Sequence, residues 1–278
     1  KIVINDSTVA NVVELDTVGN AGGIKINTGS LSLTNGAQVN ASTFGQGNAG
    51  QVKITAQDTI AIGGENLEGS PSGVDSSVDF EATGNAGGVS IKTSSLSLIN
   101  GGFINASTFS QGNAGLVKVN AQNTIVIDGE SSQGFISGIG SQVNFEAKGD
   151  AGGVNLTTGS LSLMNGGVID ASTFGQGNAG TLEIMAKDTI VIDGESLEGS
   201  VSIAASKVLP GAVGNAGGVK ITTGFLSLTN GGQANASTLG QGNAGELIVK
   251  ADSLRLDNNA KIIAATEFGF GGIIDLQI

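Results

Sequence analysis

Acidic side chains gather in three segments of this chain, and they are the residues best suited to bind an ion. The segments cover residues 63–73, 128–138 and 193–203, so they recur at a spacing of 65 residues. Carboxylates combined with turn carbonyls are ligands that suit Ca²⁺, so the segments are candidates for weak calcium sites. We favour the simpler interpretation of solvated acidic surface loops, because segments this far apart cannot share one ion. The candidate calcium ligands are Asp128, Glu130, Asp193 and Glu195.

Several residue types are missing altogether, and their absence removes whole classes of chemistry. The 278 residues include no His, Cys, Trp or Tyr. Zinc sites built on imidazole or thiolate, Ser-His-Asp and Cys-His catalysis, and disulfides are therefore excluded, and no cofactor is expected. Twelve Lys and Arg stand against 24 Asp and Glu, and this net charge of −12 argues against a nucleic-acid partner. No apolar run approaches the length of about 18 residues that a membrane span needs.

A four-residue motif recurs with a fixed period and divides the chain. Two sets of the motif, each with a period of 65 residues, interleave at offsets of 28 and 37 residues. A fixed period of this kind predicts a solenoid in which each repeat supplies structural coils. We expect one domain over residues 1–278, with a partial coil 1–18 and repeats 19–83, 84–148, 149–213 and 214–278. The motif Gly-Asn-Ala-Gly, or Gly-Asp-Ala-Gly once, begins at Gly19, Gly84, Gly149 and Gly214, and the second set begins at Gly47, Gly112, Gly177 and Gly242.

Apolar and polar residues alternate inside each coil, in short runs broken by Gly, Asn, Ser and Thr. A period of two indicates strands, and no run supports a helix of about ten residues. Three short strands joined by bends make one coil of a parallel β-helix, so the fold class is all-β with about eight to nine coils and a length of roughly 40 Å. The predicted inward pairs are Ile24/Ile26, Val52/Ile54, Val89/Ile91, Val117/Val119, Val154/Leu156, Leu182/Ile184, Val219/Ile221 and Leu247/Val249 on the first strand, and Leu31/Leu33, Ile60/Ile62, Leu96/Leu98, Ile125/Ile127, Leu161/Leu163, Ile190/Ile192, Leu226/Leu228 and Leu254/Leu256 on the second.

The third strand is predicted to differ between the short and the long coils. In the short coils it contains Val39, Ile104, Ile169 and Ala234, and in the long coils Val78/Phe80 and Val143/Phe145. The polar residues that alternate with the short-coil set are expected to face outward. These outward residues are Asn40, Asn105, Asp170 and Asn235.

One equivalent position per coil carries an amide side chain. In-register Asn side chains can hydrogen-bond along a stack of strands, and the neighbouring glycines permit the sharp corner that follows. We interpret this column as a structural ladder and not as a binding site. It consists of Asn20, Asn48, Asn85, Asn113, Asp150, Asn178, Asn215 and Asn243.

The repeats also resemble a known family. The run at residues 28–36, followed by the run Ala-Ser-Thr-Phe-Gly-Gln-Gly-Asn-Ala-Gly at residues 41–50, is similar to the repeat regions of filamentous-haemagglutinin-like exoproteins, especially large cyanobacterial ones. Related pairs of runs recur in each later repeat, so the resemblance spans nearly the whole chain. It implies a right-handed β-helix, export by two-partner secretion, and an adhesive role outside the cell or at its surface.

These observations predict a non-catalytic structural or adhesive rod, because a catalytic site would gather unlike residues at one place in the repeat. The alternatives are a polysaccharide-active β-helix enzyme, which needs paired carboxylates, and an ice- or crystal-binding face built on the recurring Ala-Ser-Thr. Expected partners are end-to-end copies or flanking coils, and a cell-surface glycan or protein. Phe44, Phe109 and Phe174, with Leu239 in the fourth repeat, are expected to pack over the end of the core, since an exposed apolar row invites aggregation.

Overall fold

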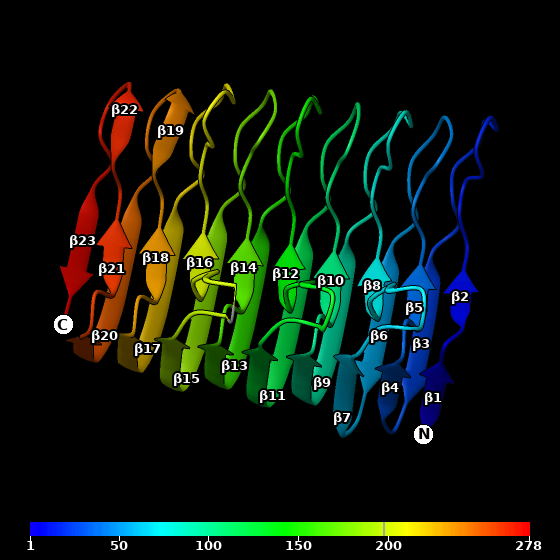
Figure 1. Ribbon diagram of the computed structural model, residues 1–278, viewed down its shortest axis with the longest axis horizontal. Helices are drawn as coiled ribbons and strands as arrows, with labels where there is room; N and C mark the ends of the chain where they lie inside the picture. Colours follow the sequence, from blue (N-terminus) through cyan, green and yellow to red (C-terminus); the bar gives the residue numbers. More distant parts are fainter. Residues whose placement is uncertain (197) are drawn as a thin grey trace.

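The computed structural model describes residues 1–196 and 198–278, and the chain folds as a parallel β-helix (Figure 1). Successive coils stack along one axis, with the two ends of the chain at opposite ends of the stack. Each strand pairs in parallel with the equivalent strand of the next coil. Strands and turns, but no helix, occur in the part of the chain that the structure describes. The predicted fold class is therefore confirmed.

Two sheets extend along the stack, and they contain twelve and nine strands among the described residues. Sheet 1 comprises β1 (Ile2–Asn5), β3 (Ile24–Thr28), β4 (Leu31–Thr34), β6 (Val52–Ala56), β7 (Thr59–Gly63), β9 (Val89–Ile99), β11 (Val117–Asp128), β13 (Val154–Met164), β15 (Leu182–Asp193), β17 (Val219–Thr229), β20 (Leu247–Leu256) and β23 (Ile274–Gln277). Sheet 2 comprises β2 (Thr8–Ala10), β5 (Gln38–Asn40), β8 (Gly73–Asp75), β10 (Phe103–Asn105), β12 (Gly138–Gly140), β14 (Val168–Asp170), β16 (Ile203–Ala205), β18 (Gln233–Asn235) and β21 (Lys261–Ile263). A separate pair is formed by β19 (Thr238–Gln241) and β22 (Thr266–Phe268).

The first two strands of each coil belong to one sheet. They are separate elements in the early coils, as β3 with β4 and β6 with β7, and they merge into single long strands from β9 onward. The register shifts at the bend inside the long strands, for example between Ala121 and Thr124. The bend between the two predicted strands is therefore gentle enough for one strand to continue through it.

The core is a single column of aliphatic side chains between the sheets. All of the predicted first-strand pairs are buried, and so are the second-strand pairs from Leu31 to Leu228. Only the last pair departs, because β23 pairs with the first half of β20 alone and leaves Leu256 47% exposed. Burying one such side chain contributes roughly 1.5–3 kcal/mol, so repetition along the stack supplies most of the stability.

The third strand lies at a different position in the long coils from the one predicted. Val39 pairs with Val74, and Ile104 pairs with Ile139, so β8 and β12 contain the inward residues. Val78 instead forms bridges to Thr43 and Thr108 at the following edge. The prediction was wrong because each acidic loop closes on itself, through an antiparallel bridge such as that between Glu65 and Pro71, and returns the chain to the sheet earlier. The inward residues of the long coils on sheet 2 are therefore Val74, Ile139 and Ala204. Val78 and Val143 are fully buried as predicted, but at the following edge of the coil, whereas Phe80 and Phe145 are exposed.

Two of the four polar residues expected to face outward on sheet 2 are covered. Asp170 is 7% exposed and Asn235 is 8% exposed, whereas Asn40 and Asn105 are half-buried. All four side chains accept a hydrogen bond from the backbone N–H two residues further on, which turns each against its own strand. Asp170 is covered further by Gln142, whose Nε2 donates to it. Among the described residues no helix is long and apolar enough to cross a membrane.

Candidate functional sites

The acidic loops bring part of the candidate calcium set together. Asp128, Glu130 and Glu195 line one open surface pocket of about 410 Å³, and Asp193 is not among its lining residues. No group of three or more His, Cys, Asp or Glu placed to hold a metal ion occurs among the described residues. The third loop includes residue 197, which lies outside the described part of the chain.

The two aspartates of the set hold turns of the neighbouring coil. Asp128 Oδ1 accepts a hydrogen bond of 2.7 Å from Asn165 Nδ2, and Asp193 Oδ1 accepts one of 2.8 Å from Asn230 Nδ2. Asn165 and Asn230 have φ near +50°, in the left-handed region that Asn tolerates better than most residues. Sequence reasoning missed this second Asn column, although the Asn-Gly pairs beginning at these two residues are its signal.

The column of Asn20, Asn48, Asn85, Asn113, Asp150, Asn178, Asn215 and Asn243 forms a continuous chain of hydrogen bonds. In each case the side-chain Oδ1 accepts from the backbone N–H of the equivalent residue in the next coil, at 2.7–3.0 Å. Direct amide-to-side-chain bonds accompany it only at Asn178 and Asn215. The column therefore links side chain to backbone, and it stabilises the corner of the coil.

Glycine at this corner is required by contact as well as by conformation. Gly112 has a φ of +136°, and a Cβ placed on it would lie 1.6 Å from the carbonyl oxygen of Gly84. Gly47 has a φ of +139° and meets Gly19 in the same way. The corners of successive coils thus pack backbone against backbone.

Sheet 2 carries two carboxylates on its outer side, Asp75, which is half-buried, and Asp170, which is buried. Burial raises the pKa of Asp75 to about 6, against hydrogen bonds from Ser77 and Asn105 that favour the charged form. Burial likewise raises the pKa of Asp170, which accepts hydrogen bonds from both the N–H and the hydroxyl of Ser172 and from Gln142 Nε2 at 2.7 Å. Asp75 and Asp170 lie three coils apart along sheet 2, with Asn105 and Gly140 at the equivalent positions between them.

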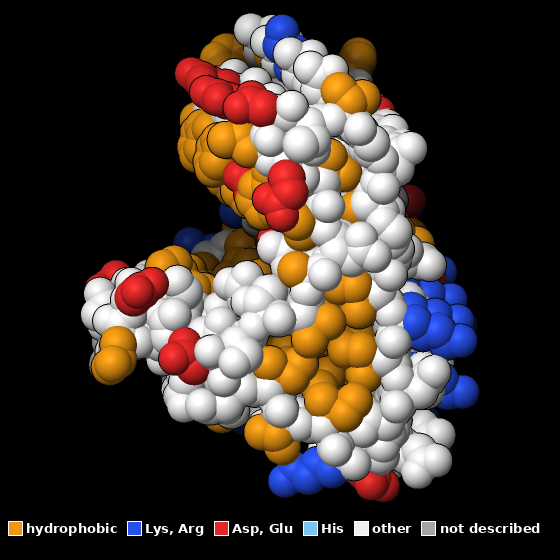
Figure 2. Space-filling model, turned by 90° about the vertical axis from the view of Figure 1, so that its right-hand side faces the viewer, with side chains coloured by type: hydrophobic (Ala, Val, Ile, Leu, Met, Phe, Trp, Pro, Cys, Tyr) orange, Lys and Arg blue, Asp and Glu red, His pale blue; other side chains and the backbone are white. Residues whose placement is uncertain are grey.

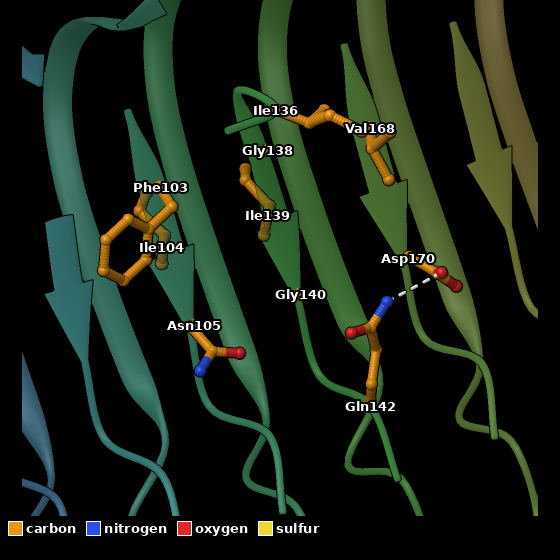
Figure 3. Close-up of a pocket in the computed structure, with 10 residues that line it drawn as sticks. All are labelled: Phe103, Ile104, Asn105, Ile136, Gly138, Ile139, Gly140, Gln142, Val168 and Asp170. Atoms are coloured by element: carbon orange, nitrogen blue, oxygen red, sulfur yellow. Dashed lines mark hydrogen bonds between the residues drawn. The ribbon is translucent and has the colours of Figure 1, made fainter. Parts of the chain in front are cut away.

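A pocket of about 300 Å³ opens over β12, and we call it the β12 pocket (Figure 3). One end is apolar and the other end carries amide and carboxylate groups. Figure 3 shows Gln142 reaching from the chain after β12 toward Asp170, across the space beside Gly140. The lining residues are Phe103, Ile104 and Asn105 of β10, Ile136 of the acidic loop, Gly138, Ile139 and Gly140 of β12, Gln142, and Val168 and Asp170 of β14.

An apolar stripe follows one edge of the stack. Leu15, Phe80 and Phe145 are exposed, at 62%, 66% and 67%, and the other members are half-buried. The stripe consists of Leu15, Phe44, Phe80, Phe109, Phe145, Phe174, Leu209 and Leu239. Figure 2, which looks along the stack from its N-terminal end, shows apolar and acidic atoms together on the upper left edge, and a hollow between this edge and a lobe at lower left.

Turn geometry is what exposes the stripe. In the long coils Ala82 N–H donates to the carbonyl of Asp79, and Ala147 N–H donates to that of Asn144, so Phe80 and Phe145 occupy the second position of a four-residue turn. The expectation that the short-coil phenylalanines pack over the core end is only partly met. Phe109 and Phe174 are half-buried, and their rings pack against those of Phe80 and Phe145 with centroids 5.2 Å apart.

Comparisons with protein families, with curated proteins and with solved structures found no match for this chain. The class of protein is therefore defined by the fold alone, as a parallel β-helix. The resemblance to filamentous-haemagglutinin-like repeats depends on the sequence runs quoted above.

Proposed function

We propose that this chain is part of a non-catalytic adhesive rod that acts outside the cell or at its surface, as the resemblance to filamentous-haemagglutinin-like exoproteins implies. The observation that carries the proposal is the apolar stripe. Its exposed phenylalanines recur along the rod, and contiguous apolar patches on a soluble surface are typical of interaction sites.

Charge and regularity support an adhesive role over a catalytic one. The stripe alternates with acidic side chains, because the exposed residues Glu81 and Glu146 follow Phe80 and Phe145 directly. An apolar row with interleaved carboxylates can contact another surface while the repulsion between like charges limits self-association. A long solenoid multiplies such weak contacts, since many copies of one motif act together. The expected partners are a cell-surface glycan or protein, and flanking coils or further copies along the axis.

The test compares adhesion of beads coated with this chain to cultured cells and to a biofilm matrix. Replacing both exposed phenylalanines, in the double variant Phe80→Ser/Phe145→Ser, should lower the number of bound beads about tenfold or more, because each buried phenyl ring contributes roughly 1.5–3 kcal/mol. The matched control is Leu116→Ser/Met185→Ser, which removes two exposed apolar side chains away from the stripe.

The control variant should adhere like the original chain, and circular dichroism should show an intact β-helix in both. Unchanged adhesion of the folded stripe variant, or equal loss in the control, would contradict the proposal. Release of reducing ends from a neutral or acidic polysaccharide, if abolished by Asp170→Asn, would instead identify an enzyme.

A further inference from the structure

The β12 pocket is the place where the outer side of sheet 2 departs from its own repeat. The equivalent tripeptides of the three long coils are Gly73–Asp75, Gly138–Gly140 and Ile203–Ala205. Only the second tripeptide has glycine at both outward positions. The residue two positions later is Ser77, Gln142 and Lys207 in the same three coils, so the second coil also carries a long amide side chain there.

Neighbouring side chains explain why this coil alone is open. The ring of Phe103 leans back over Gly73, where an added Cβ would lie 2.3 Å from the ring. It therefore covers the first long coil and leaves Gly138 of the second uncovered on that side. In the third long coil Ile203 and Ala205 fill the equivalent positions themselves.

The two ends of the β12 pocket have different chemistry. Phe103, Ile136 and Val168 form an apolar wall, and Asn105, Gln142 and Asp170 stand at the polar end. Gln142 uses its Nε2 to donate to Asp170, and its Oε1 accepts no hydrogen bond from a described residue. Figure 3 shows this oxygen directed back across Gly140 toward Asn105.

The polar end offers mainly acceptors, so a ligand must bring donors. The Asp170 carboxylate is 7% exposed and already accepts from Ser172 and Gln142, which leaves little net attraction for a cation. An anionic ligand would meet the Asp170 carboxylate, and no Lys or Arg is among the lining residues, although Lys207 of the next coil lies close enough to Asp170 to act on its charge. A neutral ligand with several hydroxyl groups and one apolar face fits these constraints.

We propose that the β12 pocket binds a neutral hexopyranose unit of a glycan. One face of the sugar ring, which carries C–H groups, packs on Phe103, and one of its hydroxyls donates to Gln142 Oε1, which accepts no hydrogen bond from a described residue. The volume of about 300 Å³ lies at the lower end of the range for ligand pockets, which suits a single ring. The hollow that Figure 2 shows beside the loops leaves room for the adjoining units of a sugar chain.

The test measures binding of methyl glycosides of glucose, galactose and mannose, and of their short oligomers, by titration calorimetry and saturation-transfer NMR. Gly140→Asn should abolish binding or weaken it about tenfold or more, because the new side chain occupies the space beside Gln142. This substitution is sterically mild, since a Cβ at Gly140 would have its nearest neighbour, Asn105 Oδ1, at 3.4 Å. Asn also occurs naturally at the equivalent positions 40, 105 and 235.

Two further variants keep the outcome interpretable. Phe103→Gln removes the apolar wall and introduces the residue found at the equivalent positions 38 and 233, and it should weaken binding to a similar extent. Ala205→Asn makes the matched change in the coil without a pocket and should leave binding unchanged. Absence of saturable binding to every neutral glycoside, binding of uronates or alkylamines alone, or binding unaffected by Gly140→Asn would overturn the proposal.

This proposal rests on the proposed adhesive function, and the two can fail separately. If the Gly140→Asn chain still adheres through the apolar stripe while no glycoside binds the original chain, the function stands and the sugar site is refuted. If glycosides bind but the stripe variant adheres normally, the assignment of adhesion to the stripe is refuted and the pocket stands.

Discussion

Replacing the half-buried carboxylate Asp75 by Asn should make the protein more stable at neutral pH. Burial raises the pKa of Asp75 from 3.8 to about 6, so the folded chain binds the proton more tightly than the unfolded chain does. A rise of about two units in the pKa means that the charged form of Asp75 lowers the free energy of unfolding by at most about 3 kcal/mol. Asp75 is partly open to solvent, so we expect Asp75→Asn to stabilise the chain by about 1–3 kcal/mol at pH 8.

The sign of the pH dependence follows from the same shift. Above pH 6 both states are ionised and the destabilisation is complete, and as the pH falls from 6 toward 4 the folded state takes up the proton first. On going from pH 8 to pH 5, protonation of Asp75 should therefore raise the free energy of unfolding of the original chain by about 1 kcal/mol. The Asp75→Asn chain lacks this rise, so its advantage in stability over the original chain should be smaller at pH 5 than at pH 8 by the same amount. Asp170 contributes in the same direction in both chains.

Asn is a fitting replacement because it occupies the equivalent positions 40, 105 and 235 of the short coils. Its oxygen can still accept from Asn105 Nδ2, and its amide can donate to the Ser77 hydroxyl. The assay is guanidinium unfolding followed by far-ultraviolet circular dichroism at pH 5 and pH 8, because the chain has no Trp. The exposed Asp252→Asn serves as the control. Equal stability of Asp75→Asn and the original chain at pH 8, or an equal rise toward pH 5, would refute the reasoning.

Two further outcomes can be checked on the same material. Gly112→Ala should lower the free energy of unfolding by more than about 3 kcal/mol or prevent folding, because the new Cβ would overlap the carbonyl oxygen of Gly84. The control Gly19→Ala should leave the free energy of unfolding nearly unchanged in the same assay, because the space around a Cβ at Gly19 is open. Addition of Ca²⁺ to about 1 mM should leave the midpoint of thermal unfolding unchanged, although a concentration of that order is enough to load a weak extracellular calcium site. A rise in the midpoint that Glu130→Gln removes would show that the acidic loops bind the ion.

The sequence predicted the stack well because its signal repeats. Ile24 and Ile26 have equivalents in every later coil, so the inward columns of the first strand could be assigned from spacing alone. The third strand of the long coils was misplaced because Val78 and Val74 both alternate with polar residues, and only the closure of the loop between Glu65 and Pro71 decides which one reaches sheet 2. That closure is an antiparallel backbone bridge within the loop, and period-two alternation carries no signal for it.

The β12 pocket was beyond sequence reasoning for a related physical cause. Gly138 and Gly140 each look like one more turn glycine in a chain that has 47 of them. Their meaning depends on Phe103, whose ring covers the preceding long coil and not theirs, and the direction in which a ring leans cannot be inferred from spacing.

In a solenoid whose coils are nearly identical, a position that departs from its column is therefore the most informative place to look for specific binding. The Asn ladder and the core columns are conserved from coil to coil within this chain, because each coil must fit the next, and such positions cannot distinguish one ligand from another. Gly138, Gly140 and Gln142 depart together in one coil, and at Gly140 no contact along the stack requires glycine, since an added Cβ would have its nearest neighbour at 3.4 Å. Repeated side chains can provide adhesion along the stripe, but recognition of a particular sugar needs a coil whose residues differ from those of the other coils. On the outer side of sheet 2, the β12 pocket lies at such a coil.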